Sequence, residues 1–153
     1  MAEMIYSPDD ISQAKNATVF MAGSIDMGKA VDWQQQMFKK TKNLNITYLN
    51  PRRPDWDSSW KEEIENEKFS EQVNWELDSL DACDTIVLYF SKESQAPISL
   101  LELGLNAGSG KMLVCCPKGY WKKGNVDIVC QRNDIPVFES MDEIIGVLKL
   151  TYG

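Results

Sequence analysis

The sequence predicts an α/β protein with a doubly wound parallel sheet of five strands and helices on both faces. Short apolar runs alternate with segments of helical periodicity, which implies successive right-handed βαβ units. The runs are continuously apolar rather than alternating, as strands covered on both faces require. The 153 residues match the usual size of one domain, so we expect a single domain over residues 1–153.

Five short apolar runs are the expected strands. In chain order they are Thr18–Ala22, Ile46–Leu49, Thr85–Phe90, Met112–Cys116 and Ile135–Phe138.

Four segments between and after these runs are the expected helices. They are Gly28–Lys40, Trp60–Asp81, Pro97–Ala107 and Met141–Leu150. Apolar residues recur at helical spacing in the first two, as Ala30, Trp33 and Met37 and then as Phe69, Val73, Leu77 and Leu80. The third opens with Pro97 at a first-turn position and runs into Gly108, which are typical start and stop signals.

Glycines, polar side chains and aromatic residues follow the first four expected strands. These segments are residues 23–28, 50–57, 91–97 and 117–121. In open α/β sheets, ligands bind beyond the carboxyl ends of the strands. The segments therefore converge on one edge of the sheet and predict a small-molecule pocket there.

Charge and hydropathy exclude several classes of function. The formal charge of −7 argues against a nucleic-acid binder, which needs a basic face for the phosphate backbone. The N-terminus lacks the features of a secretory signal, and no apolar run approaches the ~20 residues of a membrane span. We therefore expect a cytoplasmic protein without membrane contact.

The residue types available narrow the chemistry further. Histidine is absent, which excludes Ser-His-Asp and Cys-His catalysis and the commonest zinc sites. The four cysteines, Cys83, Cys115, Cys116 and Cys130, lack the spacing of a disulfide framework or metal site, so we expect them reduced and mostly buried. We expect no metal and no cofactor. Acid–base or nucleophilic work then falls to carboxylates, Lys, Tyr or Cys.

Glu102 is the first candidate for such chemistry, because four leucines and an isoleucine surround it in the sequence. A buried carboxylate is costly unless it is paired, which favours a functional role. In the alternative, Ile98, Leu101 and Leu105 share the buried face of an amphipathic helix and Glu102 points into solvent. Gly104 favours the functional interpretation, since a mid-helix Gly costs ~1 kcal/mol and usually marks a close backbone approach.

Glu76 is the second candidate, because it falls between Val73 and Leu80 on the apolar stripe of its helix. A charge on the core-facing side of a helix needs a partner or a function. A helix that borders the pocket could aim this carboxyl into it. The alternative is a structural ion pair with Arg52 or Arg53.

Ser24 follows Gly23 at the end of the first expected strand, where a turn exposes backbone N–H groups and a hydroxyl. This pattern is common in nucleotide-binding α/β proteins and in plain turns. The Gly-x-Gly-x-x-Gly fingerprint and the Walker A lysine loop are both absent, which disfavours NAD, FAD or ATP as ligand.

An ordered set of short motifs resembles the nucleoside 2-deoxyribosyltransferase family, which includes the deoxynucleoside 5′-monophosphate N-glycosidases. The motifs extend over roughly positions 18 to 130, and their order and spacing make the set more specific than its parts. They are VFMAGSI at residues 19–25, Asn50-Pro51-Arg52, Glu76-Leu77 upstream of Cys83-Asp84, and Leu101-Glu102-Leu103-Gly104.

The resemblance implies a flavodoxin-like fold, a symmetric homo-oligomer and a retaining double displacement. Glu102 matches the family's nucleophile, and Glu76 matches an acidic residue, usually Asp, beside the leaving base. Asn125 matches an Asn that reaches into a neighbouring subunit's site to hold the sugar 5′-hydroxyl. We expect the substrate to contact Ser24, Asp26, Asn50, Ser94, Gln95, Asn125 and Asp127.

Two departures from the family pattern bear on substrate choice. The transferases often carry a Tyr on the first strand that hydrogen-bonds the nucleophile, and this chain has Phe20 there. They also carry an Asp six residues before the nucleophile that reads the base, and this chain has Ala96, with Ser94 and Gln95 beside it.

Three functions are consistent with these residues. In the leading hypothesis, Glu102 takes the deoxyribose from a nucleoside and a second free nucleobase then attacks, so that the bases are exchanged. In the second, water intercepts the same intermediate and the enzyme hydrolyses nucleosides or their 5′-monophosphates. Ser24, Arg52, Arg53 and Lys118 could then hold a phosphate. In the third, the chain is a non-catalytic nucleotide-sensing module.

Overall fold

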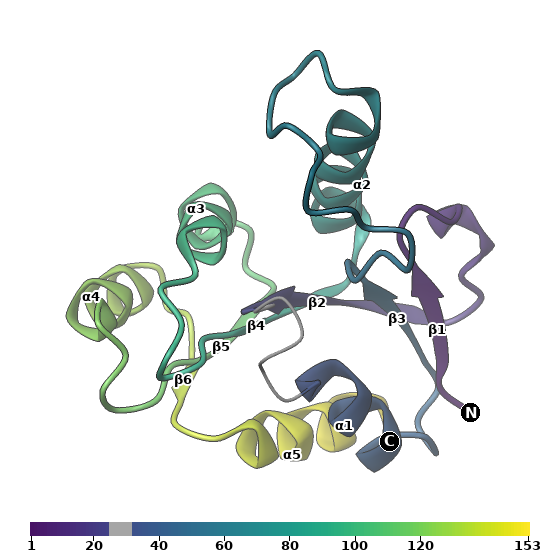
Figure 1. Cartoon of the computed structure of the whole chain (residues 1–153). Helices are drawn as coiled ribbons and strands as arrows, with labels where there is room; N and C mark the ends of the chain where they lie inside the picture. The colour runs from purple at the N-terminus through teal and green to yellow at the C-terminus, as the bar shows by residue number, and fades with distance from the viewer. Residues whose placement is uncertain (25–31) are drawn as a thin grey trace.

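A parallel six-stranded sheet forms the centre of the molecule in a computed structural model, which describes residues 1–24 and 32–153 (Figure 1). Its strand order is β1-β3-β2-β4-β5-β6, and every neighbouring pair is parallel. The strands are β1 (Glu3–Tyr6), β2 (Ala17–Gly23), β3 (Ile46–Asn50), β4 (Thr85–Tyr89), β5 (Met112–Cys115) and β6 (Val137–Phe138). From β3 to β6 the order is that of flavodoxin-like doubly wound sheets, so the α/β prediction is confirmed.

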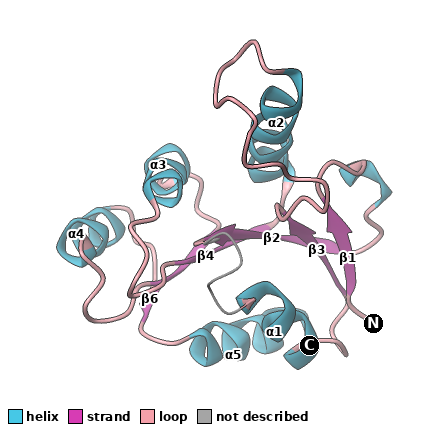
Figure 2. Cartoon of the chain, viewed as in Figure 1, coloured by secondary structure: helices cyan, strands magenta, loops and turns pink. Residues whose placement is uncertain are grey.

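Helices cover both faces of this sheet (Figure 2). One face carries α2, α3 and α4, and the other carries α1 and α5 (Figure 1). The helices are α1 (Trp33–Lys40), α2 (Glu67–Ala82), α3 (Pro97–Asn106), α4 (Lys123–Arg132) and α5 (Met141–Tyr152), and a short 3-10 helix spans Ile11–Gln13.

The five-strand prediction is wrong, because β1 adds a sixth strand at the edge of the sheet. It has only four residues, and they are exposed or half-buried, so it lacks the apolar run of an inner strand. Helix α4 was also not predicted. It buries only Val126 and Cys130, too few apolar positions to show a helical stripe in the sequence.

Two predicted helix starts differ from the structure. Helix α2 begins at Glu67 rather than Trp60, because the Asn66 side chain accepts a hydrogen bond from the Phe69 N–H at 3.1 Å and caps the first turn. The described part of α1 begins at Trp33, where the Asp32 carboxylate accepts from the Gln35 N–H. The predicted start at Gly28 lies outside the described residues.

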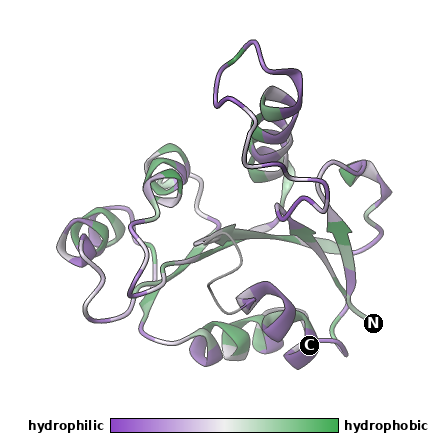
Figure 3. Ribbon diagram, in the orientation of Figure 1, coloured by the Kyte–Doolittle hydropathy of each residue, from purple (hydrophilic) through white to green (hydrophobic). Residues whose placement is uncertain are grey.

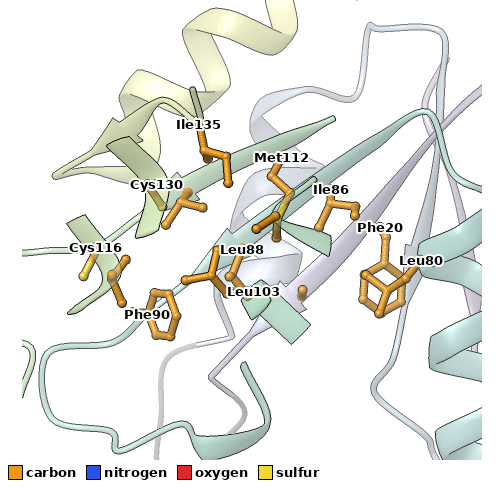
Figure 4. Packing of buried hydrophobic residues seen from close by; sticks show 14 of the residues in the cluster. Phe20, Leu80, Ile86, Leu88, Phe90, Leu103, Met112, Cys116, Cys130 and Ile135 are labelled. Atoms are coloured by element: carbon orange, nitrogen blue, oxygen red, sulfur yellow. The ribbon is translucent and has the colours of Figure 1, made fainter. Parts of the chain in front are cut away.

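The core has two halves, one on each face of the sheet. Alternate residues of β2 belong to different halves: Phe20 packs under α2 and α3, whereas Met21 packs under α1 and α5. Figure 4 shows the first half, in which Phe20 lies near Leu80 and the side chains of Leu88 and Leu103 meet. Burial on both faces explains why the central strands are continuously apolar, a pattern visible as green strands in Figure 3.

All four cysteines are buried free thiols, as the sequence predicts. They serve as small core residues, and burial raises the pKa of each thiol, so these cysteines are poor nucleophiles.

Candidate active site

The candidate site lies where β2 and β4 end, the point at which the strand order reverses. Gly23 closes β2 with a φ of 142°, and a Cβ there would lie 2.2 Å from the carbonyl oxygen of Tyr89. Only glycine therefore allows the two strands to approach so closely.

Ser24 follows at once and is buried between the two strand ends. Its N–H donates to the Tyr89 carbonyl at 2.9 Å, and its hydroxyl oxygen accepts from the Ser91 N–H at 3.1 Å. Its carbonyl accepts from the Trp33 indole N–H at 3.1 Å. These bonds fix Ser24 at the mouth of the sheet, where the sequence predicts a ligand contact.

Glu102 lies on the buried side of α3, and only 6% of the residue is exposed. The amphipathic alternative is therefore wrong. The helix buries Ser99, Glu102 and Asn106 against the sheet and turns Leu101 and Leu105 outward. Asn106 donates to the Glu102 carbonyl at 2.9 Å, which holds this turn of the helix in place.

Gly104 has a different role from the one expected. An added Cβ would have nothing within 4 Å among the described residues, so Gly104 marks no close backbone approach within the chain.

Glu76 projects from α2 and is half-buried. Its partner is Gln72, whose amide nitrogen lies 3.4 Å from the Glu76 carboxylate and 2.8 Å from the Pro51 carbonyl. The ion-pair alternative is not realised, because Arg53 pairs with Asp55 and Glu71 instead.

The predicted stripe of α2 is wrong in one respect. Leu77 is exposed, and the buried positions of the helix are Gln72, Trp75, Ser79 and Leu80. This buried set includes the two polar residues Gln72 and Ser79, so hydrophobicity alone did not predict the core-facing side.

The negative charge of Glu76 acts on Glu102. Burial, followed by the negative charge of Glu76, raises the pKa of Glu102 to about 8. Burial also raises the pKa of Glu76 to about 7, although the hydrogen bond from Gln72 lowers it. Within residues 1–24 and 32–153, neither carboxyl has an ion-pair partner. Such a pair retains a proton near neutral pH, when an ordinary carboxyl is ionised.

Asn50 and Arg52 lie at the end of β3, on either side of Pro51, whose carbonyl accepts from Gln72. The Arg52 N–H donates to the Asn50 side-chain oxygen at 2.9 Å. The Arg52 Nε donates to the Gln34 side-chain oxygen at 2.9 Å and lies 3.5 Å from the Asp32 carboxylate.

The remaining predicted site residues have varied surroundings. Ser94 is buried just before α3, and its N–H donates to the Ser91 carbonyl at 3.2 Å. Gln95 is exposed, and its carbonyl accepts from the Tyr120 hydroxyl at 2.6 Å and the Trp121 indole at 3.0 Å. Asp26 lies outside the described residues.

Asn125 and Asp127 lie on α4, which the sequence did not predict as a helix. Asn125 is exposed on the first turn, and Asp127 forms an ion pair with Lys123 at 3.1 Å. Trp121 is exposed, but Tyr120 is buried against Phe90, with ring centroids 4.7 Å apart.

Two residues of the site were missed from the sequence. Gln72 joins Glu76 to the end of β3, and Gln34 joins α1 to Arg52. Gln34 stands in a run of three glutamines, and nothing in the sequence distinguishes it from its neighbours.

Two absences among the described residues concern metal binding and membrane insertion. Within the described residues, no group of three or more Cys, Asp or Glu side chains could hold a metal ion. None of the helices that the structure describes is long and apolar enough to cross a membrane.

Comparison with known proteins identifies the family. The profile described as "Nucleoside 2-deoxyribosyltransferase like" matches residues 16–120, more than half of the chain. The chain belongs to this family. Membership supports a nucleoside-processing role and small nucleoside-related substrates. The matched range includes both candidate carboxylates and ends before α4.

Solved structures support the fold independently. The chain is similar to a conserved protein from Enterococcus faecalis V583, with 11% identity and a TM-score of 0.62. The match covers 89% of this chain and 99% of that one. No curated protein matches the chain.

The structure explains one departure from the family pattern. Phe20 is fully buried, with its ring centroid 6.3 Å from that of Trp75. An aromatic hydrocarbon there packs under α2 and offers no hydroxyl to a carboxylate. Ala96, the second departure, starts α3 in a left-handed conformation with a φ of 48°.

Proposed function

We propose that the protein breaks and remakes the N-glycosidic bond of 2′-deoxynucleosides, with Glu102 as covalent nucleophile and Glu76 as proton donor to the leaving base. One observation carries the proposal: Glu102 is buried and Glu76 half-buried, neither has an ion-pair partner among residues 1–24 and 32–153, and the negative charge of Glu76 helps to raise the pKa of Glu102. Family membership supports the same assignment.

The proposed reaction has two balanced steps. A Glu102 carboxylate oxygen bonds to the sugar C1′ as the C1′–N bond breaks, and the bond's electron pair leaves with the base. Glu76 delivers its proton to that base. In the second step, another base attacks C1′, releases Glu102 and returns a proton to Glu76. Two displacements on one carbon retain its configuration.

The shared proton suits this reaction. At rest the higher pKa places the single proton of the pair on Glu102, so the reaction requires the proton to lie on Glu76 when substrate is bound, with Glu102 attacking as the carboxylate. The positive charge that develops at C1′ in the transition state favours ionised Glu102. Both raised pKa values therefore predict an activity optimum near neutral pH, where the pair holds a single proton.

One incubation tests the function. Deoxyinosine is mixed with free adenine, and the products are separated by chromatography. Deoxyadenosine together with hypoxanthine shows exchange, the result that we expect. Free hypoxanthine without deoxyadenosine shows that water intercepts the intermediate. Binding of a nucleoside with no product of either kind would indicate a sensing module and contradict the proposal.

We also propose a homodimer with shared active sites. Its support is the α3 stripe, which we define as Ile98, Leu101 and Leu105, exposed at 60%, 58% and 61%. Exposed apolar groups in one row are typical of an interface. The stripe lies on the helix that carries Glu102, so a second copy seated there would border the site.

Asn125 is the residue that the partner would contribute. It is exposed on α4, the neighbour of α3 on the same face of the sheet (Figure 1). The proposal is tested by mixing inactive Glu102→Ala subunits with inactive Asn125→Ala subunits. Mixed dimers contain one site with both wild-type groups, so some activity should return. A fully active monomer in light scattering at micromolar concentration would contradict the shared site.

A further inference from the structure

Three buried nitrogen donors without partners lie together at the end of β3. They are the Gln34 side-chain nitrogen, the Asn50 side-chain nitrogen and one terminal nitrogen of Arg52, and none has a hydrogen-bond partner within the described part of the chain. Gln34 and Asn50 are both 0% exposed. Buried donors are rarely left unpaired, because an unmade hydrogen bond is costly, so three in one place indicate a missing acceptor. We call these three groups the donor cluster.

The orientation of both amides follows from their partners. The Asn50 oxygen accepts from the Arg52 N–H, and the Gln34 oxygen accepts from the Arg52 Nε, each at 2.9 Å. Both partners are donors only, so in each amide the oxygen must face Arg52 and the NH₂ group must remain free. The free groups of the donor cluster can therefore only donate.

The donor cluster and Glu76 approach the end of β3 from opposite faces of the sheet, because Gln34 lies on α1 and Glu76 on α2 (Figure 1). Gln72 donates to the carbonyl of Pro51, the residue between Asn50 and Arg52, and its nitrogen also lies 3.4 Å from the Glu76 carboxylate. If Glu76 protonates the leaving base, the base must lie against Glu76. A base held against Glu76 lies near Pro51, whose two sequence neighbours Asn50 and Arg52 belong to the donor cluster.

We infer that the donor cluster binds a carbonyl oxygen of the leaving base, so that the enzyme prefers oxo-bases to their amino counterparts. This inference rests on the proposed function. Hypoxanthine presents an oxygen where adenine presents an NH₂ group, and uracil differs from cytosine in the same way. A site made only of donors pairs with the oxygen, whereas it opposes an amino group with a second donor.

A phosphate is the competing acceptor, and local charge disfavours it. Asp32 lies 3.5 Å from the Arg52 Nε and offsets much of the only cationic charge in the donor cluster. Glu76 is joined through Gln72 to the carbonyl of Pro51, the residue between Asn50 and Arg52. A dianion beside these carboxylates would be repelled, whereas a neutral carbonyl would not.

The test compares matched substrates with the unmodified protein. Initial rates of base release are measured for deoxyinosine against deoxyadenosine and for deoxyuridine against deoxycytidine. We expect kcat/KM to be at least about tenfold higher for the oxo member of any pair that is cleaved. Equal values within such a pair would overturn the inference and leave the proposed function intact.

Two variants each replace a free donor with an acceptor and keep the hydrogen bond to Arg52. Gln34→Glu and Asn50→Asp each keep the oxygen that accepts from Arg52 and replace the free NH₂ with an oxygen. Each should lower the oxo-to-amino ratio of kcat/KM at least about tenfold. Gln36→Glu, the same change at an exposed position of α1, is the control and should leave the ratio unchanged.

Two further outcomes separate the remaining explanations. If the variants change the preference for 5′-monophosphates over nucleosides but leave the oxo-to-amino ratio unchanged, the donor cluster holds a phosphate and the inference is wrong. If no nucleoside is cleaved, the proposed function fails. Calorimetric titration with free hypoxanthine and free adenine then decides the inference, with tighter binding of hypoxanthine expected and equal binding contradicting it.

Discussion

Helices α3 and α5 cover opposite faces of the same sheet, and they bury opposite kinds of residue (Figure 1). Helix α5 buries Ile144, Ile145 and Leu148. Its start is capped by Ser140, whose hydroxyl accepts from the Glu143 N–H at 3.4 Å and donates to the Glu143 carboxylate at 3.1 Å. This is an ordinary amphipathic helix with a side-chain N-cap.

Helix α3 is inverted by comparison. It faces the sheet with Ser99, Glu102 and Asn106 as well as Leu103, has no side-chain cap, and exposes the α3 stripe. Stability alone would favour the reverse arrangement, because apolar burial stabilises and carboxylate burial destabilises. The residues that the two helices bury therefore indicate that the α5 face of the sheet serves folding, whereas the α3 face serves the site and the proposed interface.

The largest effect that we expect is a difference in rate between two variants, one that removes a carboxylate from α3 and one that removes a carboxylate from α5. Glu102→Ala should lower the rate of base release at least about a thousandfold, since the nucleophile is lost. Glu143→Ala on α5 should leave the rate unchanged and cost less than about 0.5 kcal/mol of stability, because the Ser140 hydroxyl still accepts from the backbone N–H of residue 143. If Glu102→Ala retains more than about a tenth of the wild-type rate, its activation free energy rises by less than ~1.4 kcal/mol. Glu102 is then not the nucleophile.

The leucines of the two helices should respond differently to truncation. Leu148→Ala on α5 should lower the free energy of unfolding by about 2–5 kcal/mol, because it leaves a cavity in the core. Leu101→Ala on α3 should cost less than about 0.5 kcal/mol when the chain is dilute enough to be monomeric. Urea titration measures both, and similar losses would show that the α3 stripe belongs to the monomer's own core.

Glu76 allows a kinetic test of the second carboxyl. Glu76→Gln keeps the shape of the side chain but cannot give up a proton, so kcat should fall about a hundredfold while KM changes little. Steady-state kinetics on deoxyinosine measures both constants. An unchanged kcat with a raised KM would make Glu76 a binding residue instead.

The smallest effect is a gain in stability that depends on pH. The pKa of Glu102 rises from an ordinary 4.5 to about 8 on folding, so its contribution to stability is present below pH 4.5 and lost as the pH rises to 8. Glu102→Gln is neutral throughout. It should therefore unfold like the wild type at pH 4.5 and be roughly 1–3 kcal/mol more stable at pH 8.5. Equal stabilities at both pH values would show that burial does not disfavour the charge.

The inner strands and α5 were predictable because burial determines their residues. Strands β2 and β4 are covered on both faces, and α5 has one apolar side, so hydrophobicity carries the information. Strand β1 and helix α4 were missed because they lie at the margins and bury few apolar groups. That residues 1–153 form one domain stays a prediction.

The site was predictable only in part. Glu102 and Glu76 stand out as charges in apolar contexts, but the inverted face of α3 contradicts its own hydrophobic pattern. Gln34 and Gln72 act through contacts with residues 18 and 21 positions away, and no local pattern encodes such contacts.

Covalent trapping tests the central claim most directly. The protein is incubated with a 2′-fluoro-2′-deoxynucleoside, whose fluorine slows turnover of the sugar–enzyme ester, and its peptides are then sequenced by mass spectrometry. We expect the mass of the fluorinated sugar on Glu102 in wild-type protein and no such adduct in Glu102→Gln. Base release without an adduct on Glu102, or with the sugar attached to another residue, would contradict the account.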